Sequence, residues 1–191
     1  MSVELNSDQV SLCHGRMARL RPAVEKDAEL MLTLRQTPEY TQYIPALDID
    51  LEAQKKWIRS NVGNPLDWTF AVDRIFDGKT EGFLGLYGIR DRQAEWGRWV
   101  MREGSVVGLE AVFLLHRLAF EGIGLSRIYS LTIQENRRVV SFHDKYGAKR
   151  KAVLRGAKLL RGQTFDVVEH EITLAAWPEI RNKHAMLLRL Q

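Results

Sequence analysis

One stretch of the sequence, residues 97–147, limits the possible folds more than any other. An alternating aromatic segment ends at Met101, and a glycine-containing loop follows it. A long apolar run then extends over residues 106–120 and stops before two further glycines, which end helices well. The remaining residues predict a strand over 127–133 and a helix that ends at Gly147. The stretch therefore predicts the order strand, glycine loop, buried helix, strand, helix.

The strand before the loop is predicted to alternate without interruption. One face would carry Trp96, Arg98 and Val100, and the other would carry Gly97, Trp99 and Met101.

The helix after the loop is predicted to be mostly buried, because its polar residues Glu110, Arg117 and Glu121 share one narrow stripe. Ser105 stands where an N-cap hydroxyl is expected. A helix that begins after a glycine loop offers free backbone N–H groups and the positive end of its dipole, which suit a phosphate or pyrophosphate. An ordinary strand-to-helix turn would look the same, so both interpretations stay open here.

Composition places the chain among ordinary globular proteins. It has 191 residues, 45% hydrophobic and 27% charged, with a net charge of +4. No apolar run is long enough for a membrane span, and the N-terminus lacks the features of a signal peptide. Cys13 is the only cysteine, so we expect no internal disulfide and a cytoplasmic location. A basic run over residues 145–161 would suit an anionic ligand or form a solvated face.

The rest of the chain completes a mixed α/β pattern within one domain, residues 1–191. Residues 1–15 show no clear period. Strands are expected over residues 17–21, 68–75, 81–90, 94–101, 127–133, 149–155 and 165–174. Helices are expected over residues 24–37, 51–62, 106–120, 136–147 and 178–190, with Asp48 or Asp50 capping the second of them. We therefore predict a central, mostly antiparallel mixed sheet flanked by helices.

Two segments resemble the GNAT superfamily of acyl-CoA-dependent N-acyltransferases. Residues 136–148 (NRRVVSFHDKYGA) are similar to the family's asparagine, hydrophobic helix and closing glycine. Residues 95–100 (EWGRWV) are similar to its fourth strand, which opens to hold pantetheine. The order of elements over residues 16–176 also fits. The resemblance implies a GNAT-like fold, acetyl-CoA as acyl donor and no metal.

The resemblance also implies a set of donor-binding residues. Val100, Met101 and Arg102 would pair with pantetheine through their backbones, and Asn136 would contact the same arm. The pyrophosphate would lie on the amides of Gly104, Ser105, Val106, Val107, Gly108 and Leu109. The loop departs from the family pattern, because Val106 stands in place of a glycine and Glu103 in place of a glutamine or arginine.

Candidate catalytic residues follow from the same resemblance. His143 stands seven residues after Asn136, where the family usually has the tyrosine that protonates the leaving thiolate; it could instead be a packing residue. Glu95 is the candidate general base, with a surface carboxylate as the alternative. Asp166 would hold a substrate amine or form an ion pair with the basic hairpin. Trp96 and Trp99 would wall the acceptor site or belong to the core.

The implied function is acetyl transfer to a small-molecule primary amine. The segments LRQTPEYTQYI and GQTFDVVEHEIT resemble the branch that acetylates amino sugars, often nucleotide-linked, in surface polysaccharide synthesis. RLRPA and EWGRW also resemble the ribosomal-protein N-terminal acetyltransferases. A non-catalytic acyl-CoA-binding module is a third reading. We expect no membrane partner and no nucleic acid partner, although the basic run leaves an RNA contact open. A homodimer also stays open.

Overall fold

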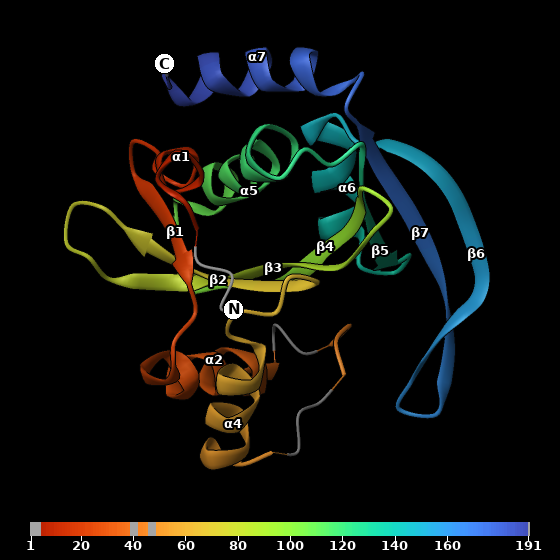
Figure 1. Ribbon diagram of the computed structural model, residues 1–191. Helices are drawn as coiled ribbons and strands as arrows, with labels where there is room; N and C mark the ends of the chain where they lie inside the picture. Colours follow the sequence, from red (N-terminus) through yellow and green to blue (C-terminus); the bar gives the residue numbers. More distant parts are fainter. Residues whose placement is uncertain (1–4, 39–41, 46–48, 191) are drawn as a thin grey trace.

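The computed structural model describes residues 5–38, 42–45 and 49–190. Within them, seven strands form one sheet in the order β1-β2-β3-β4-β5-β7-β6 (Figure 1). The strands are β1 (Ala18–Pro22), β2 (Asp67–Arg74), β3 (Thr80–Arg90), β4 (Gln93–Met101), β5 (Arg127–Ile133), β6 (Lys149–Leu160) and β7 (Gln163–Thr173). Of the six neighbouring pairs, β4–β5 alone is parallel. The predicted fold class is confirmed.

Helices cover both faces of the sheet. One face carries α2 (Ala28–Gln36), which follows the 3-10 turn η1 (Glu25–Asp27), and α4 (Leu51–Asn61). The opposite face carries α1 (Ser7–Leu12), α5 (Gly108–Arg117) with its π-helical extension η2 (Leu118–Gly122), and α6 (Arg137–Tyr146), while α7 (Trp177–Leu188) lies over α5 (Figure 1). No helix of the described residues is long and apolar enough to span a bilayer.

Local sequence signals explain most of the boundaries. Asp50 caps α4 by accepting a hydrogen bond from Ala53 N at 2.7 Å; the other candidate cap, Asp48, lies outside the described residues. Asn136 caps α6, and Gly147 ends that helix with φ of +110°. The turn Arg161-Gly162 joins β6 to β7 with both residues at positive φ, as two-residue hairpins require.

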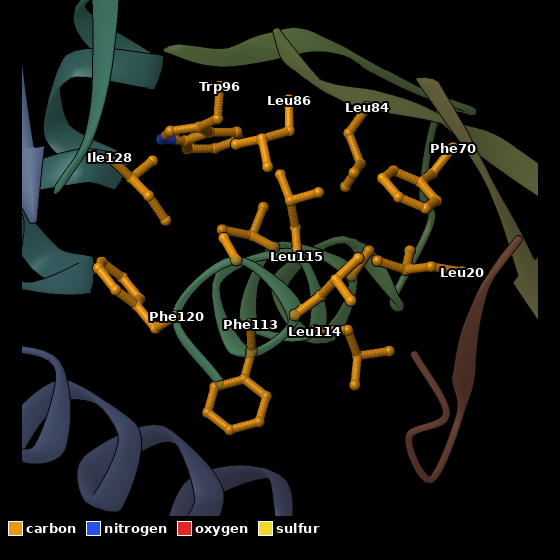
Figure 2. Packing of buried hydrophobic residues seen from close by; sticks show 14 of the residues in the cluster. Leu20, Phe70, Leu84, Leu86, Trp96, Phe113, Leu114, Leu115, Phe120 and Ile128 are labelled. Carbon is orange, nitrogen blue, oxygen red and sulfur yellow. The ribbon is translucent and has the colours of Figure 1, made fainter. Parts of the chain in front are cut away.

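The core on the α5 face surrounds a helix that is buried almost all round. Leu114 and Leu115 of α5 lie under the sheet residues Leu84, Leu86 and Trp96 (Figure 2). Phe113 points the other way and packs against Trp177 of α7, with ring centroids 5.7 Å apart. Because α5 is covered on both sides, its apolar surface extends around most of the helix, as the sequence predicted.

The polar stripe of α5 and its extension η2 binds other parts of the protein. Glu110 is fully buried and accepts hydrogen bonds from the backbone amides of Arg16 and Met17. Arg117 donates to the carbonyl of Leu12, and Glu121 accepts from the indole N–H of Trp177 at 2.8 Å. The stripe therefore holds the N-terminal segment and α7 against the central helix.

One sequence prediction about this region is wrong, and two features were not predicted. Residues 7–12 form α1, a six-residue helix with a capping box between Asn6 and Gln9 and no buried residue to give it a period. Ser105 is not the N-cap of α5, because the helix begins at Gly108 with Val107 as its cap. The predicted run to Phe120 changes from α-helix to a π-helical turn after Arg117.

Two buried histidines make the fold sensitive to acid. Burial lowers the pKa of His116 to about 4 and, together with the neighbouring imidazoles, lowers the pKa of His143 to about 3. Both are therefore neutral in the folded protein near pH 7. An unfolded histidine titrates near pH 6.5, so between pH 6.5 and about 4 the unfolded chain binds protons that the folded chain excludes.

We predict that the free energy of unfolding falls with acidification below pH 6.5, by up to about 1.4 kcal/mol per pH unit for each of these histidines. His116→Phe removes one titrating group at similar size, so its decline between pH 6.5 and 5 should be shallower. Urea unfolding at pH 7, 6 and 5 measures this, with the exposed His14→Gln as control. Identical slopes in wild type and His116→Phe would contradict the prediction.

Candidate active site

The sheet opens between β4 and β5. Their parallel pairing covers three residue pairs and ends at Glu95 with Tyr129. From Trp96 to Met101, the edge of β4 that faces β5 has no strand partner among the described residues. A cavity of about 430 Å³ occupies the opening and is lined by both strands, by α6, by β6 and by the end of α2.

Aromatic side chains fill the inner part of this opening. Trp96 and Trp99 lie with ring centroids 5.9 Å apart, and Trp99 packs against Phe142 of α6 at 4.6 Å. His143 meets the edge of Trp96 at 5.1 Å. Trp96 and Trp99 belong to the core on the α5 face and also line the cavity, so the two interpretations of these residues do not exclude each other.

A β-bulge at Arg98 corrects the predicted alternation of β4. Arg98 has φ of +51°, and two residues of β4, Arg98 and Trp99, lie there opposite one residue of β3, Leu84. As a result Val100 packs on the α2 side, whereas Trp96 packs on the α5 side. Asp67 holds the bulge in place with a two-point ion pair to the Arg98 guanidinium, which also lies 4.3 Å over the ring of Tyr87.

Glu95 lies at the apex of the opening, half-buried. The Tyr87 hydroxyl donates a hydrogen bond to its Oε1 at 2.9 Å. Burial raises the pKa of Glu95 above its ordinary value, although the tyrosine and the nearby cations of Lys158 and Arg98 partly oppose this. Gly97 makes the arrangement possible, because a Cβ there would lie 2.6 Å from the Tyr87 hydroxyl. A carboxylate with a raised pKa at a cavity apex is suited to accept a proton near neutral pH.

His143 also lines the cavity but is nearly excluded from solvent. Ser130 Oγ of β5 lies 3.2 Å from its Nε2 and 3.4 Å from its Nδ1. Its other face stacks on His170 at 4.9 Å, and His170 in turn contacts Asp144 Oδ1 at 3.1 Å. Because its pKa is lowered to about 3, mainly by burial, the imidazole stands in the cavity as a neutral group.

The loop after β4 ends at the first turn of α5. Gly104 has φ of +71°, which the turn requires, and Val106 projects into solvent. The hydroxyl of Ser105 is buried and has no hydrogen-bond partner among the described residues. Gly108 begins the helix, and a Cβ there would make only ordinary contact with Trp99, at 3.6 Å. Free amides, an unused hydroxyl and a helix start together fit an anionic group such as a pyrophosphate.

Two cations of the cavity wall were not singled out by the sequence analysis, although Lys158 belongs to the basic run that it matched to an anionic ligand. Arg35 reaches the cavity from the last turn of α2, and Lys158 reaches it from β6. A bulge at Gly156, with φ of +61°, redirects β6 toward the opening. The bulge is held by Asp166, which accepts from Gly156 N at 2.9 Å and forms an ion pair with Arg155. Of the two roles considered for Asp166, the ion pair with the basic hairpin is the one observed.

The rest of the basic run is largely engaged elsewhere. Arg150 forms an ion pair with Asp144 at 2.5 Å, and Lys151 lies 3.6 Å from Glu171. Within the described residues, no three His, Cys, Asp or Glu side chains are grouped as a metal site would need.

This fold, with a sheet that opens beside a glycine loop and a helix start, defines an acyl-CoA-dependent acetyltransferase. The chain belongs to the GNAT acetyltransferase family, whose domain model matches residues 18–149. It is therefore an N-acetyltransferase, and acetyl-CoA is the donor used by this family. No curated protein sequence matches the chain.

Solved structures agree on the fold. A GCN5-related N-acetyltransferase from Brucella melitensis matches with a TM-score of 0.79 at 19% identity, over 92% of this chain and 84% of that one. A chimera of the spermidine N-acetyltransferase SpeG from Vibrio cholerae with hSSAT matches with 0.77 at 17% identity, over 85% and 99%. FdhC, a nucleotide-linked sugar GNAT, matches with 0.75 at 23% identity, over 90% and 95%.

The hydrogen bond between Tyr87 and Glu95 gives a direct test of the site's electrostatics. Tyr87→Phe removes the donor, and Gly97→Ala pushes the hydroxyl away from the carboxylate, so both should raise the pKa of Glu95 further. Carbon-13 NMR titration of the Glu95 carboxyl measures the change. Gly108→Ala, whose added methyl group has room, is the matched control. An unchanged pKa in Tyr87→Phe would show that the hydrogen bond does not influence the carboxylate.

Proposed function

We propose that this protein transfers an acetyl group from acetyl-CoA to the primary amine of an amino sugar, with a nucleotide-linked sugar as the preferred acceptor. The observation that carries the proposal is that Glu95 and His143 line one cavity at the point where β4 and β5 separate. The amine and the thioester must meet at such a point, flanked by a proton acceptor and a hydrogen-bond donor.

The donor-binding residues are proposed from the fit of the site. Backbone groups of Val100, Met101 and Arg102 would hold the pantetheine arm along the free edge of β4, with Asn136 on the other side of the opening. The amides of the loop and the first turn of α5 would hold the pyrophosphate: Gly104, Ser105, Val106, Val107, Gly108 and Leu109. The orphaned Ser105 hydroxyl supports this placement, since a phosphate oxygen would give it a partner.

Glu95 is proposed as the general base. An amine is protonated in neutral water and must lose a proton before its nitrogen can attack a thioester carbon. Glu95 would take that proton, directly or through a water molecule, while the nitrogen–carbon bond forms and the carbon–sulfur bond breaks. Because burial raises its pKa, the proton transfer from an amine is less unfavourable than it would be to an exposed carboxylate.

His143 is proposed to stabilise the departing sulfur as a neutral imidazole. The sequence analysis expected a protonated imidazole that loses its proton as pH rises. The low pKa of the buried ring favours a different role, in which a ring N–H, placed beside Ser130, donates a hydrogen bond toward the thiolate. A thiolate is a tolerable leaving group, so this donor assists the reaction without being essential.

The charge of the cavity favours an acidic or neutral acceptor over a polycation. Arg35, Arg98 and Lys158 all line the space where the acceptor would lie, and among the described residues Arg98 alone of the three forms an ion pair, with Asp67. A polyamine would be repelled by these cations, whereas the phosphates of a nucleotide-linked sugar would be attracted. This supports the amino-sugar branch among the candidates.

CoA should stabilise the protein. At a free concentration one hundred times its dissociation constant, the gain is about 2.7 kcal/mol, seen as a rise in melting temperature. Gly108→Asp should abolish the rise, because it sets a negative charge beside the pyrophosphate amides, whereas Gly108→Ala should keep it. An unchanged melting temperature in millimolar CoA would contradict the proposed donor site.

The transfer itself can be followed by thiol release from acetyl-CoA. The acceptors are a nucleotide-linked amino sugar, the free amino sugar, spermidine and a peptide with a free N-terminus. We expect the first to react best, and Glu95→Gln to lower kcat about 10²- to 10⁴-fold. Activity should rise with pH through the raised pKa of Glu95. Preference for the peptide would move the acceptor to the N-terminal acetyltransferases, and full kcat in Glu95→Gln would remove Glu95 as the base.

Variants of His143 distinguish a neutral imidazole from a protonated one. His143→Leu should lose roughly 10²-fold in kcat, and His143→Gln, which keeps an N–H donor, should lose less. Since the imidazole is neutral through the working range, the wild-type and His143→Gln profiles of kcat against pH should share their upper limb. If kcat falls at high pH in the wild type but not in His143→Gln, the wild-type histidine acts as a protonated acid instead. Unchanged kcat with a lower melting temperature in both variants would make His143 a packing residue.

A further inference from the structure

One cation in the cavity wall, Arg35, has no counter-charge among the residues that the structure describes. Arg35 extends from the last turn of α2, whose residues Met31 and Leu34 anchor the helix in the core beneath it. Its Nε is buried and has no hydrogen-bond partner among the described residues. One terminal nitrogen lies 3.5 Å from the carbonyl oxygen of Pro45, at the limit of a hydrogen bond. No described carboxylate forms an ion pair with this guanidinium.

The other charged groups of the cavity do not neutralise Arg35. Arg98 is nearby and positive, and its own partner Asp67 is occupied by a two-point ion pair. Glu95 is bound by Tyr87 at the apex and has a raised pKa. Lys158 adds a further positive charge on the β6 side. Burial and the charge of Arg98 together lower the pKa of Arg35, which is the signature of a cation held without a counter-ion.

An ion of opposite charge would correct each of these features. A guanidinium offers five N–H donors in a planar fork, which matches the oxygens of a phosphate or a carboxylate. Arg35, whose Nε–H has no hydrogen-bond partner among the described residues, lines the same cavity as Glu95. A single acceptor molecule can therefore present its amine to the carboxylate and an oxyanion to the guanidinium.

We propose that Arg35 is the acceptor-binding residue that recognises an anionic group of the substrate, a phosphate or a carboxylate, with Lys158 as a second cation on the opposite wall. This inference rests on the proposed acetyl transfer and specifies the acceptor as an amine that also carries a negative charge. The amine end lies toward the apex of the opening, and the anionic end lies toward α2 and β6.

Steady-state kinetics with saturating acetyl-CoA test the proposal. The acceptors share one amino sugar: linked to a nucleoside diphosphate, bearing a single phosphate, oxidised to a carboxylate, and as the neutral methyl glycoside. Arg35→Gln should raise KM for the recognised anionic form about 10- to 150-fold, the range for a lost charge-assisted hydrogen bond. The KM for the neutral glycoside, kcat and the KM for acetyl-CoA should change less than about threefold.

Two further variants separate recognition from folding. Arg35→Lys keeps the charge but not the planar fork, so it should recover part of the lost affinity. Arg59→Gln removes an exposed arginine of α4 that pairs with Glu25, and it should behave as wild type. The anionic acceptor whose KM rises most in Arg35→Gln identifies the recognised group as a phosphate or a carboxylate. Equal losses for charged and neutral acceptors, or a wild-type enzyme indifferent to the charge, would overturn the proposal.

A binding measurement keeps the inference separate from the catalytic proposal. With CoA saturating its own site, calorimetric titration with inorganic pyrophosphate or with succinate should show binding of one of them in wild type and at least tenfold weaker binding in Arg35→Gln. If no amine is acetylated but this difference appears, the anion site stands and the proposed function fails. If neither anion distinguishes the two proteins, the anion site is wrong even where acetyl transfer is found.

Discussion

The separation of β4 from β5 is the constraint on which the rest of the site depends. Three residue pairs join the strands, which then separate beside the packed rings of Trp99 and Phe142 and of Trp96 and His143. On the edge of β4 that faces β5, the backbone groups beyond Glu95 have no strand partner among the described residues. A sheet normally avoids unpaired backbone in its interior, because such groups lose hydrogen bonds. Here the opening is kept by packing, and the exposed groups become available to a ligand.

Two bulges complete the cavity, one on each side of it. The bulge at Arg98 places a non-glycine residue at positive φ, which is a strained conformation. The ion pair with Asp67 and the contact with the Tyr87 ring offset that strain. The bulge at Gly156 uses glycine and a hydrogen bond to Asp166 instead. Bulges are common beside binding sites because they redirect side chains without ending a strand.

The sequence predicted the fold well where local signals were strong. Asn136 before a helix, Gly147 after it, and the turn at Arg161-Gly162 each have a conformational cause that acts within a few residues. The first helix was missed because six residues with no buried face have no period to detect. The alternation of β4 failed because a bulge shifts the phase of a strand, and only the mismatch of pairing partners reveals it.

The site was predicted in part. Glu95, Asn136 and His143 line one cavity, and the roles that the resemblance implies for them stay predictions. Their environment could not be read from the sequence: the neutral state of His143 depends on burial against residues far along the chain. Arg35 was missed because helical periodicity does not reveal which face of a sheet a helix covers. Lys158 had one usable signal, the glycine in the middle of its predicted hairpin.

The hydrogen bonds between α5 and the N-terminal segment have a consequence for the order in which the protein folds. Glu110 and Arg117 hold backbone groups of residues 12–17 across separations of 93 to 105 residues. During synthesis, β1 leaves the ribosome long before these partners exist. The N-terminal end of β1 cannot be fixed until α5 has emerged. The edge of the sheet at β1 therefore stays incomplete while the neighbouring strands form. The first strand to be made is in this respect among the last to be secured.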